Sequence, residues 1–297
     1  MKIIITGSLG NISKPLTIDL VGKGHSVTVI SSKLEKQKEI EALGAKAAIG
    51  PLEDVSFLVK SFTGADVAYC MIPPNNYFDH NLDLIEYYHR IGNNYVQAIQ
   101  ESGVKRVIHL SSIGAHLDQG TGIILGHHYV EGVLNKLSNV AITFMRPTAF
   151  YYNLYGFLDT IKRTGVIASN YGEEDKVPWV SPIDIARAIA EEIGLPPVDR
   201  KVRYVASEEL TCNEVAAILG AAIGKPDLKW KVITNEQMQN GLEAVGMAPR
   251  IASGLVELNA ALHDGTLSEN YFRNRPEMGK VRLSDFAKEF AIAFKQN

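Results

Sequence analysis

The first ten residues, Met1-Lys-Ile-Ile-Ile-Thr-Gly-Ser-Leu-Gly10, decide the fold of this chain. An apolar, β-branched run ends at Thr6, glycines follow at positions 7 and 10, and helical spacing begins near Asn11. Strand, glycine turn and helix in this order bring backbone N–H groups and a helix N-terminus to a pyrophosphate. A side chain at the turn would obstruct the phosphates or forbid the backbone conformation. The spacing Gly-x-x-Gly-x-x-Ser, which ends at Ser13, is also compatible with a plain surface turn.

Short apolar runs alternate with amphipathic segments throughout the first half of the chain. The runs predicted as strands are 2–6, 26–31, 45–49, 66–72, 106–111 and 140–146, and the predicted helices are 11–23, 33–43, 54–62, 78–102 and 123–137. Repeated β-α-β units with apolar strands are typical of a parallel sheet with helices on both faces. We therefore predict an α/β fold, a doubly wound parallel sheet of the Rossmann type, with residues 1–150 as the dinucleotide-binding domain.

The pattern changes after residue 150. An aromatic segment and a polar loop at 170–176 precede Ser181-Pro182, where serine as N-cap and proline at the first helical position predict a helix start. Further helices are predicted at 211–223, 234–245 and 249–262, and a last one begins at Ser284. We expect residues 151–297 to form a smaller, mostly helical substrate or cap region, with some segments returning to the sheet.

Composition excludes several classes of protein. The 297 residues carry a net charge of −3 without a basic cluster, which argues against direct nucleic-acid binding. Cys70 and Cys212 form neither a Cys-x-x-Cys pair nor a disulfide framework, which fits a reducing, cytoplasmic setting. No signal-peptide pattern is present, and no apolar stretch approaches the roughly 20 residues that span a bilayer. We expect a cytoplasmic protein without a metal site.

The end of the second strand predicts the choice of dinucleotide. An acidic residue there would bind the ribose 2′-hydroxyl of NAD, but the chain has Ser31, Ser32 and Lys33, and no carboxylate before Glu35. Hydroxyls and an ammonium group suit a 2′-phosphate. Lys33 is equally compatible with a solvated helix start, so the missing acid is the stronger argument. We predict NADP(H) in preference to NAD(H).

Ligands of open α/β sheets bind beyond the carboxyl ends of the strands. The residues predicted on this basis to bind the cofactor are Gly7, Ser8, Leu9, Gly10, Asn11, Ile12, Ser31, Ser32, Lys33, Leu52, Glu53, Ile72, Pro73, Pro74, Ser111, Ser112 and Pro147. Leu52 and Glu53 are expected along the adenine, and Ile72 to Pro74 toward the nicotinamide. The residues predicted to contact the acceptor are Asn75, Tyr77, Phe150, Tyr151 and Asn153. Packing beneath the cap is the alternative for the aromatic residues after the sixth strand.

Nearly the whole chain resembles the NmrA-like branch of the atypical short-chain dehydrogenases/reductases. The motifs that carry the resemblance are Thr6-Gly7-x-x-Gly10, Val107-Ile-His-Leu-Ser-Ser112, Glu131-x-x-Leu134, Thr143-Phe-Met-Arg-Pro147 with Phe150 and Asn153, and Val180-x-x-x-Asp184-Ile-Ala186. The resemblance implies binding of NADP(H) or NAD(H). It also implies one of two roles, because some members reduce quinones or related small electrophiles and others are redox-sensing regulators without clear turnover.

One departure from the wider family bears on catalysis. Active short-chain dehydrogenases use a Tyr-x-x-x-Lys pair, but here Tyr129 is followed four residues later by Val133. The nearest lysine, Lys136, is seven residues from Tyr129, about 10 Å along a helix. The NmrA-like pattern usually has a lysine four residues before Glu131, where this chain has His127.

The candidate catalytic residues are therefore His127 and, with less importance, Tyr129. An imidazole can donate a hydrogen bond or pass a proton near neutral pH. The alternative for His127 is a helix-start residue paired with Glu131. His109, within the fifth strand, is predicted to be a packing residue.

Two functions remain open on the sequence alone. The leading one is hydride transfer from NADPH to a small quinone-like or other unsaturated acceptor, with no membrane or nucleic-acid partner. The alternative is a non-catalytic dinucleotide sensor that acts through a protein partner. A closed aromatic cavity beside the nicotinamide would favour the enzyme, and a sealed or polar one the sensor. A sugar-nucleotide epimerase or dehydratase shares the fold but also requires the Tyr-Lys pair, so it ranks lowest.

Overall fold

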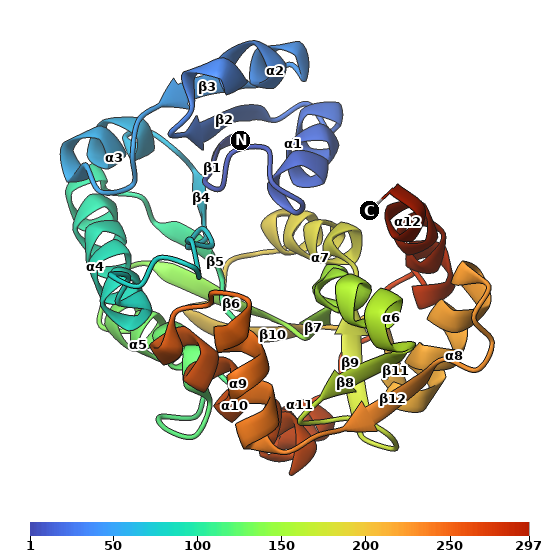
Figure 1. Ribbon diagram of the computed structural model, residues 1–297. Coiled ribbons are helices and arrows are strands. Elements are labelled where there is room, and N and C mark those ends of the chain that lie inside the picture. The colour runs from blue at the N-terminus through green and yellow to red at the C-terminus, as the bar shows by residue number, and fades with distance from the viewer. Residues whose placement is uncertain (297) are drawn as a thin grey trace.

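The computed structural model describes residues 1–296 and is built around a seven-stranded parallel sheet (Figure 1). Its strand order is β10-β6-β5-β4-β1-β2-β3. The strands are β1 (Lys2–Ile5), β2 (Ser26–Ser31), β3 (Lys46–Ile49), β4 (Val67–Cys70), β5 (Arg106–Leu110), β6 (Ala141–Pro147) and β10 (Arg200–Val205). The structure thus confirms the predicted doubly wound, Rossmann-like α/β fold.

Helices cover both faces of this sheet, as the pattern of buried residues in β1 requires. Ile3 and Ile5 point into one apolar cluster and Ile4 into the other, because successive side chains of a strand face opposite ways. The helices on the first face are α1 (Ser13–Gly22), α2 (Gln37–Ala42), preceded by the turn η1 (Leu34–Lys36), and α7 (Pro182–Gly194). Those on the second face are α3 (Val55–Phe62), α4 (Leu84–Ser102) and α5 (Leu125–Leu134), with the turn η2 (Gly122–Ile124) before α5.

Helix α4 is shorter at its start than the predicted helix over 78–102. The side chain of Asp83 accepts a hydrogen bond from the backbone N–H of Glu86, at 3.0 Å, and so caps the helix at Leu84. Residues 71–83 consequently form a loop beyond the end of β4. This loop is free to contribute to a site at the carboxyl edge of the sheet.

The second half of the chain adds helices and two small sheets, of order β11-β9-β7 and β12-β8. The strands are β7 (Ala149–Phe150), β8 (Val166–Ser169), β9 (Lys176–Val180), β11 (Glu208–Thr211) and β12 (Lys229–Val232). The helices and turns are η3 (Tyr151–Phe157), α6 (Leu158–Thr164), α8 (Cys212–Ile223), α9 (Asn235–Ala244), α10 (Pro249–His263), η4 (Thr266–Ser268), α11 (Glu269–Arg273) and α12 (Leu283–Gln296). A third apolar cluster, which includes Trp179, Trp230 and Phe290, holds much of this half together.

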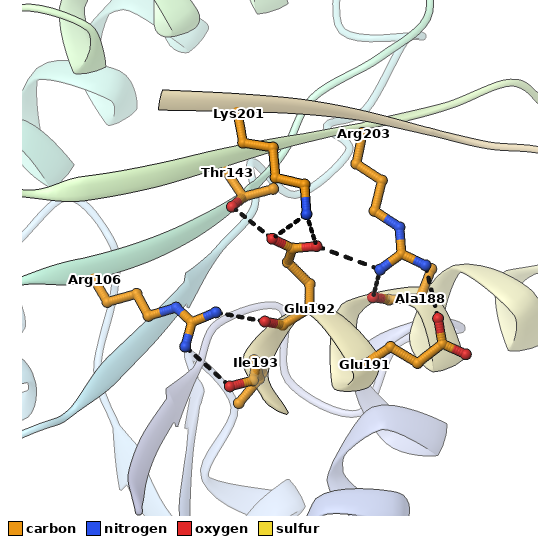
Figure 2. A network of polar contacts seen from close by, with 8 residues as sticks. All are labelled: Arg106, Thr143, Ala188, Glu191, Glu192, Ile193, Lys201 and Arg203. Carbon is orange, nitrogen blue, oxygen red and sulfur yellow. Dashed lines mark hydrogen bonds and ion pairs between the residues drawn. The ribbon is translucent and has the colours of Figure 1, made fainter. Parts of the chain in front are cut away.

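Two elements beyond residue 150 belong to the central layers. Strand β10 pairs in parallel with β6 as the edge of the seven-stranded sheet, and α7 packs beside α1 (Figure 1). Arg106 of β5 holds the end of α7, because its guanidinium donates to the backbone carbonyls of Glu192 and Ile193 (Figure 2). These donations satisfy carbonyl groups that have no partner within the helix.

The side chain of Glu192 completes the attachment of α7 to the sheet (Figure 2). Its carboxylate accepts from Thr143 of β6 at 3.1 Å and from Lys201 and Arg203 of β10 at 2.8 and 3.3 Å. Burial opposes its ionisation, yet Lys201, Thr143 and Arg203 together hold the pKa of Glu192 below its ordinary value. Within residues 1–296 no helix is both long and apolar enough to cross a membrane.

Candidate dinucleotide-binding site

The glycine turn after β1 has a backbone that excludes other residues at Gly7. Gly7 has φ +88°, and a Cβ added there would lie 2.8 Å from Oγ of Ser13 and 2.9 Å from Sδ of Met71. The hydroxyl of Ser13 donates to the carbonyl of Thr6 at 2.9 Å, and the Thr6 hydroxyl accepts from the N–H of Met71 at 2.8 Å. The turn is therefore held closely between the start of α1 and the end of β4.

A cleft of about 300 Å³ opens between this turn and the carboxyl ends of β2, β3 and β4. It is lined by Gly7, Ser8, Gly10, Asn11, Ile12, Ser13, Ile30, Ser31, Ser32, Gly50, Leu52, Met71, Pro73, Pro74 and Tyr152. Most of the cofactor residues predicted from the turn and the first strand ends are among them. Ser13, Ile30, Gly50, Met71 and Tyr152 were not predicted, although the first four lie in the same turn or strand ends.

The cleft has the features that a pyrophosphate requires. Gly10 has no side chain, and this leaves the cleft open beside it. A Cβ at this position would closely approach only one atom, the carbonyl oxygen of Gly7 at 3.2 Å, so the space around it is otherwise free. Ile12, at the start of α1, supplies no side-chain cap, so no side chain occupies the free N–H groups of the first helical turn. Such groups together with the helix dipole form an anion site. The residues present therefore fit a dinucleotide.

The other predicted cofactor residues lie around the cleft rather than in its wall. Lys33 and Glu53 are exposed, whereas Ile72 and Pro147 are buried. Leu9 packs against the apolar cluster on the α1 side, and Ser112 is half-buried. The side chain of Ser111 is buried and turned away, as described below.

The end of β2 gathers hydroxyl groups and positive charge. The Ser31 hydroxyl accepts from Oγ of Ser8 at 2.9 Å and from the N–H of Lys33 at 3.2 Å. Lys33 makes no ion pair within the described residues. The nearby acid of α2, Glu39, is bound by Lys14 and by Lys36, each at 2.9 Å. These two hydrogen bonds lower the pKa of Glu39 to about 2, so its charge is constant near neutral pH and is matched by two lysines.

A buried ion pair joins two of the sequence motifs behind the cleft. Arg146 of β6 donates from Nε and Nη2 to the two carboxylate oxygens of Glu131 in α5, at 2.9 and 2.6 Å. The hydroxyl of Ser111 donates to the same carboxylate at 2.5 Å. Glu131 is thus engaged with Arg146, not with His127 as the alternative prediction had it. The sequence indicates this ion pair only indirectly, because Glu131 and Arg146 are single charged residues within otherwise apolar segments.

His127 lies against Tyr88 of α4. Its Nε2 is 3.4 Å from the Tyr88 hydroxyl, and the two rings meet edge to face with centroids 5.0 Å apart. Burial lowers the pKa of His127 to about 4, so the imidazole is neutral at pH 7. His109 is fully buried, and burial, followed by His127, lowers its pKa to about 3. Within residues 1–296, neither ring nitrogen of His109 has a hydrogen-bond partner, as befits a packing residue.

Tyr129 occupies the outer side of α5. The residue is 38% exposed and its ring stands edge-on to His89, with centroids 4.2 Å apart. It is not among the residues of the cleft wall. The structure therefore separates the two candidate catalytic residues, with His127 half-buried against α4 and Tyr129 exposed on the outer side of α5.

The residues predicted to contact the acceptor also differ in burial. Tyr151 is 1% exposed and donates to Glu208 at 2.8 Å within the third apolar cluster, while Asn75 and Asn153 are exposed. Tyr77 and Phe150 are half-buried. The aromatic side chain that reaches the cleft is Tyr152, whose ring centroid lies 4.9 Å from that of Phe150.

A Rossmann sheet with a glycine turn, an uncapped helix start and a cleft over the strand ends is the arrangement typical of dinucleotide-binding proteins of the α/β class. The model of the NmrA-like family matches residues 1–267, and the chain belongs to this family. Its sequence is 26% identical over 297 residues to the NAD(P)H azoreductase of Xenophilus azovorans. This alignment covers 98% of the present chain and 99% of the azoreductase.

Solved structures with the same fold include two reductases. An NADPH-dependent quinone oxidoreductase of Escherichia coli, complexed with NADPH, superposes with a TM-score of 0.80 at 19% identity, over 97% of this chain and 99% of that one. The triphenylmethane reductase of a Citrobacter species, complexed with NADP(H), has a TM-score of 0.78 at 18% identity, over 98% of this chain and 100% of that one.

Proposed function

We propose that the protein is an NADPH-dependent reductase that transfers hydride to a small, planar, unsaturated acceptor such as a quinone. The observation that carries the proposal is the composition of the cleft. It starts at the glycine turn, passes the apolar side chains of Met71 and Pro73, and reaches an aromatic ring at Tyr152 without an ionisable group other than that phenol. An uncharged wall with apolar side chains and an aromatic ring at one end suits a conjugated acceptor stacked near the cofactor.

NADPH is proposed as the reductant because of the residues at the end of β2. Ser31, Ser32 and Lys33 offer hydroxyls and an ammonium group where an NAD-specific protein would place an acid. The exposed Lys33 can reach a 2′-phosphate without breaking an ion pair. The turn from Gly7 to Ile12 would hold the pyrophosphate.

The proposed chemistry requires little of the protein beyond binding and orientation. The bound cofactor supplies the hydride, and its ring is positioned by the residues at the carboxyl ends of the strands. His127 is neutral and hydrogen-bonded to Tyr88, so it adds no charge to the site. Azo compounds, quinones and triphenylmethane dyes, the acceptor types in the names of the similar reductases, are all conjugated and aromatic or quinonoid, and we extend this class to the present chain.

The test is the oxidation of NADPH followed by its absorbance across a panel of quinones, azo dyes, triphenylmethane dyes and simple aldehydes. We expect turnover with the conjugated compounds and little with aliphatic aldehydes. Gly10→Val serves as the control that has lost the cofactor site. Tight NADPH binding without turnover of any acceptor would reject the enzyme in favour of a dinucleotide sensor.

The sensor remains the second candidate because of one observation. The hydroxyl of Ser111, at the end of β5 and nearest to the expected position of the reactive carbon, is bound to Glu131 within the protein. A sensor needs a stable cofactor complex and a partner, but no such hydroxyl. Retention of a partner protein by the NADP⁺ form and not by the NADPH form would support this candidate.

A further inference from the structure

Tyr152 presents a free phenol at the dinucleotide cleft. The residue lies in the first turn of η3, directly after β7, and lines the cleft together with Gly7 and Met71. Its ring is fixed by Phe150, at a centroid distance of 4.9 Å. Within residues 1–296 its hydroxyl has no hydrogen-bond partner, whereas that of Tyr151 is bound to Glu208. A ligand in the cleft is therefore the partner that the Tyr152 hydroxyl lacks.

Two further phenols, those of Tyr77 and Tyr88, lie near Tyr152 from other elements. Burial and the neighbouring phenol of Tyr77, in the loop after β4, raise the pKa of Tyr152. The pKa of Tyr88 on α4 is raised by burial and then by Tyr77, Tyr87 and Tyr152. None of these phenols is ionised near neutral pH, and His127 is neutral as well. The neighbourhood of Tyr152 thus offers polar O–H groups without a net charge.

The position of Tyr88 depends on close packing between α4 and α5. A Cβ added to Gly126 would lie 2.6 Å from Cγ and 2.8 Å from Cδ1 of Tyr88. Glycine at this position lets the Tyr88 ring rest on the backbone of α5, where its hydroxyl reaches His127. The phenol of Tyr88 therefore has a partner inside the protein, whereas the phenol of Tyr152 has none within residues 1–296 and lies in the wall of the cleft.

We propose that the hydroxyl of Tyr152 donates a hydrogen bond to the acceptor atom, oxygen or nitrogen, on which negative charge gathers as hydride arrives. This inference rests on the proposed reductase function and names a hydrogen-bond donor for a protein that lacks the Tyr-x-x-x-Lys pair. Hydride carries two electrons to the acceptor and leaves NADP⁺, and a proton from water completes the reduced product. Tyr152 keeps its own proton, since a neutral donor in a dry site stabilises the developing charge without transferring it.

The first experiment compares Tyr152→Phe with the matched variant Tyr155→Phe. Tyr155 lies in the same element, but its ring packs on Phe286 and Phe290, with centroids 5.0 and 5.8 Å away, in the third apolar cluster. With NADPH and menadione, we expect Tyr152→Phe to lower kcat by about a hundredfold, the usual effect of removing one such donor. The KM for menadione and the dissociation constant for NADPH should change by less than about twofold, because the ring is retained. Tyr155→Phe should match the parent protein.

The second experiment needs no turnover. We expect para-nitrophenolate, titrated into the NADP⁺ complex and followed by absorbance, to bind about tenfold more weakly to Tyr152→Phe than to the parent or to Tyr155→Phe. Equal affinity in all three proteins overturns the inference, even if kcat falls, since the hydroxyl then binds no anion. Equal turnover of parent and Tyr152→Phe also overturns it while the reductase function stands. If affinity depends on Tyr152 but no acceptor oxidises NADPH, the donor site stands and the reductase function fails.

Discussion

Ser8 and Ser31 share a hydrogen bond between their side-chain oxygens, 2.9 Å long, that joins the glycine turn after β1 to the end of β2. The backbone reinforces the link, because the N–H of Ser8 donates to the carbonyl of Ile30 at 3.0 Å. Both serines line the cleft. The part of the protein that would bind the pyrophosphate is therefore held directly against the part that would read the adenosine ribose.

Cofactor choice should follow from this strand end. One charge-assisted contact with the 2′-phosphate is worth about 1.5–3 kcal/mol, so NADPH should bind roughly ten- to a hundredfold more tightly than NADH. Ser32→Asp introduces an acid that repels the phosphate and accepts from a free 2′-hydroxyl, and should shift the preference toward NADH. Calorimetric titration of both cofactors measures the ratio, with the exposed Ser284→Asp of α12 as control. Equal dissociation constants in the parent would show that the strand end does not select the cofactor.

The two glycines of the turn should fail in different ways. Gly10→Val places a branched side chain in the open cleft, so NADPH binding should be lost while the protein remains folded. Gly7→Ala should instead destabilise the fold by about 1–3 kcal/mol, because φ is +88° there and the new Cβ meets Ser13 and Met71. Urea unfolding and calorimetry together separate the two effects. A folded Gly10→Val protein with unchanged affinity for NADPH would contradict the assignment of the cleft.

The ion pair between Arg146 and Glu131 should dominate the stability of the region behind the cleft. Glu131→Ala leaves a buried guanidinium without its partner, and we expect a loss of about 3–5 kcal/mol in the free energy of unfolding. Asp19→Ala breaks the exposed pair with Lys23 and should cost less than about 0.5 kcal/mol. Urea unfolding curves give both values. Similar small losses for the two variants would mean that Arg146 finds other acceptors.

His127 and Tyr129 should differ in their effect on turnover. His127→Ala removes the hydrogen-bond partner of Tyr88 and, if His127 contacts the cofactor or acceptor as predicted from the sequence, should lower kcat by more than about tenfold. Tyr129→Phe changes a surface phenol and should lower it by only a few fold at most. The opposite order would mean that Tyr129 acts without a lysine.

The pH dependence of turnover should reflect the neutral state of His127. Its pKa of about 4 predicts a kcat that stays level from about pH 5 to pH 8. A histidine that acted as an acid with an ordinary pKa near 6.5 would give a rate that falls above that pH. The kcat profile of the parent with menadione, measured beside that of His127→Gln, distinguishes the two behaviours.

Stability should decline in mild acid because of the two buried histidines. The folded-state pKa values are about 3 for His109 and about 4 for His127, against 6.5 for a free side chain. The unfolded chain therefore binds more protons below pH 6.5, and stability, complete above that value, falls as the pH drops toward 4. His109→Leu should reduce the slope by up to about 1.4 kcal/mol per pH unit. Urea unfolding at a series of pH values measures how the free energy of unfolding changes with pH. The exposed His80→Gln serves as control and should leave this slope unchanged, and an unchanged slope for His109→Leu would show that His109 is not involved.

The central sheet was predictable from the sequence because its strands are uninterrupted apolar runs between clear glycine turns. Helix starts were harder: α4 begins at Leu84 rather than near residue 78, since the cap at Asp83 outweighs the periodicity before it. The small sheets were missed because their strands are only a few residues long and pair with segments distant in sequence, such as β8 with β12. Two to five residues give too little alternation to identify a strand.

The site was predictable where it depends on backbone and not where it depends on side-chain direction. The glycine turn and the strand ends line the cleft as the parallel-sheet rule requires. The aromatic residues after the sixth strand were predicted either to contact the acceptor or to pack beneath the cap. In the structure Tyr151 turns into the third cluster and Tyr152 reaches the cleft, a division that the sequence did not reveal. The pairing of Glu131 with Arg146 arises only when α5 packs on β6, which no local pattern reveals.

Because the chain returns to the central sheet at β10, we expect that the two halves cannot be expressed as separate, folded fragments. A polypeptide that ended at residue 150 would lack β10, so β6 would become an exposed edge strand. Arg106 would also lose the two backbone carbonyls of α7 to which it donates hydrogen bonds. The chain crosses between the halves after β6, again before α7, and once more after β10. Any movement of the second half toward the cleft must therefore bend several backbone connections at the same time. Such a movement would not be a free rotation about a single linker.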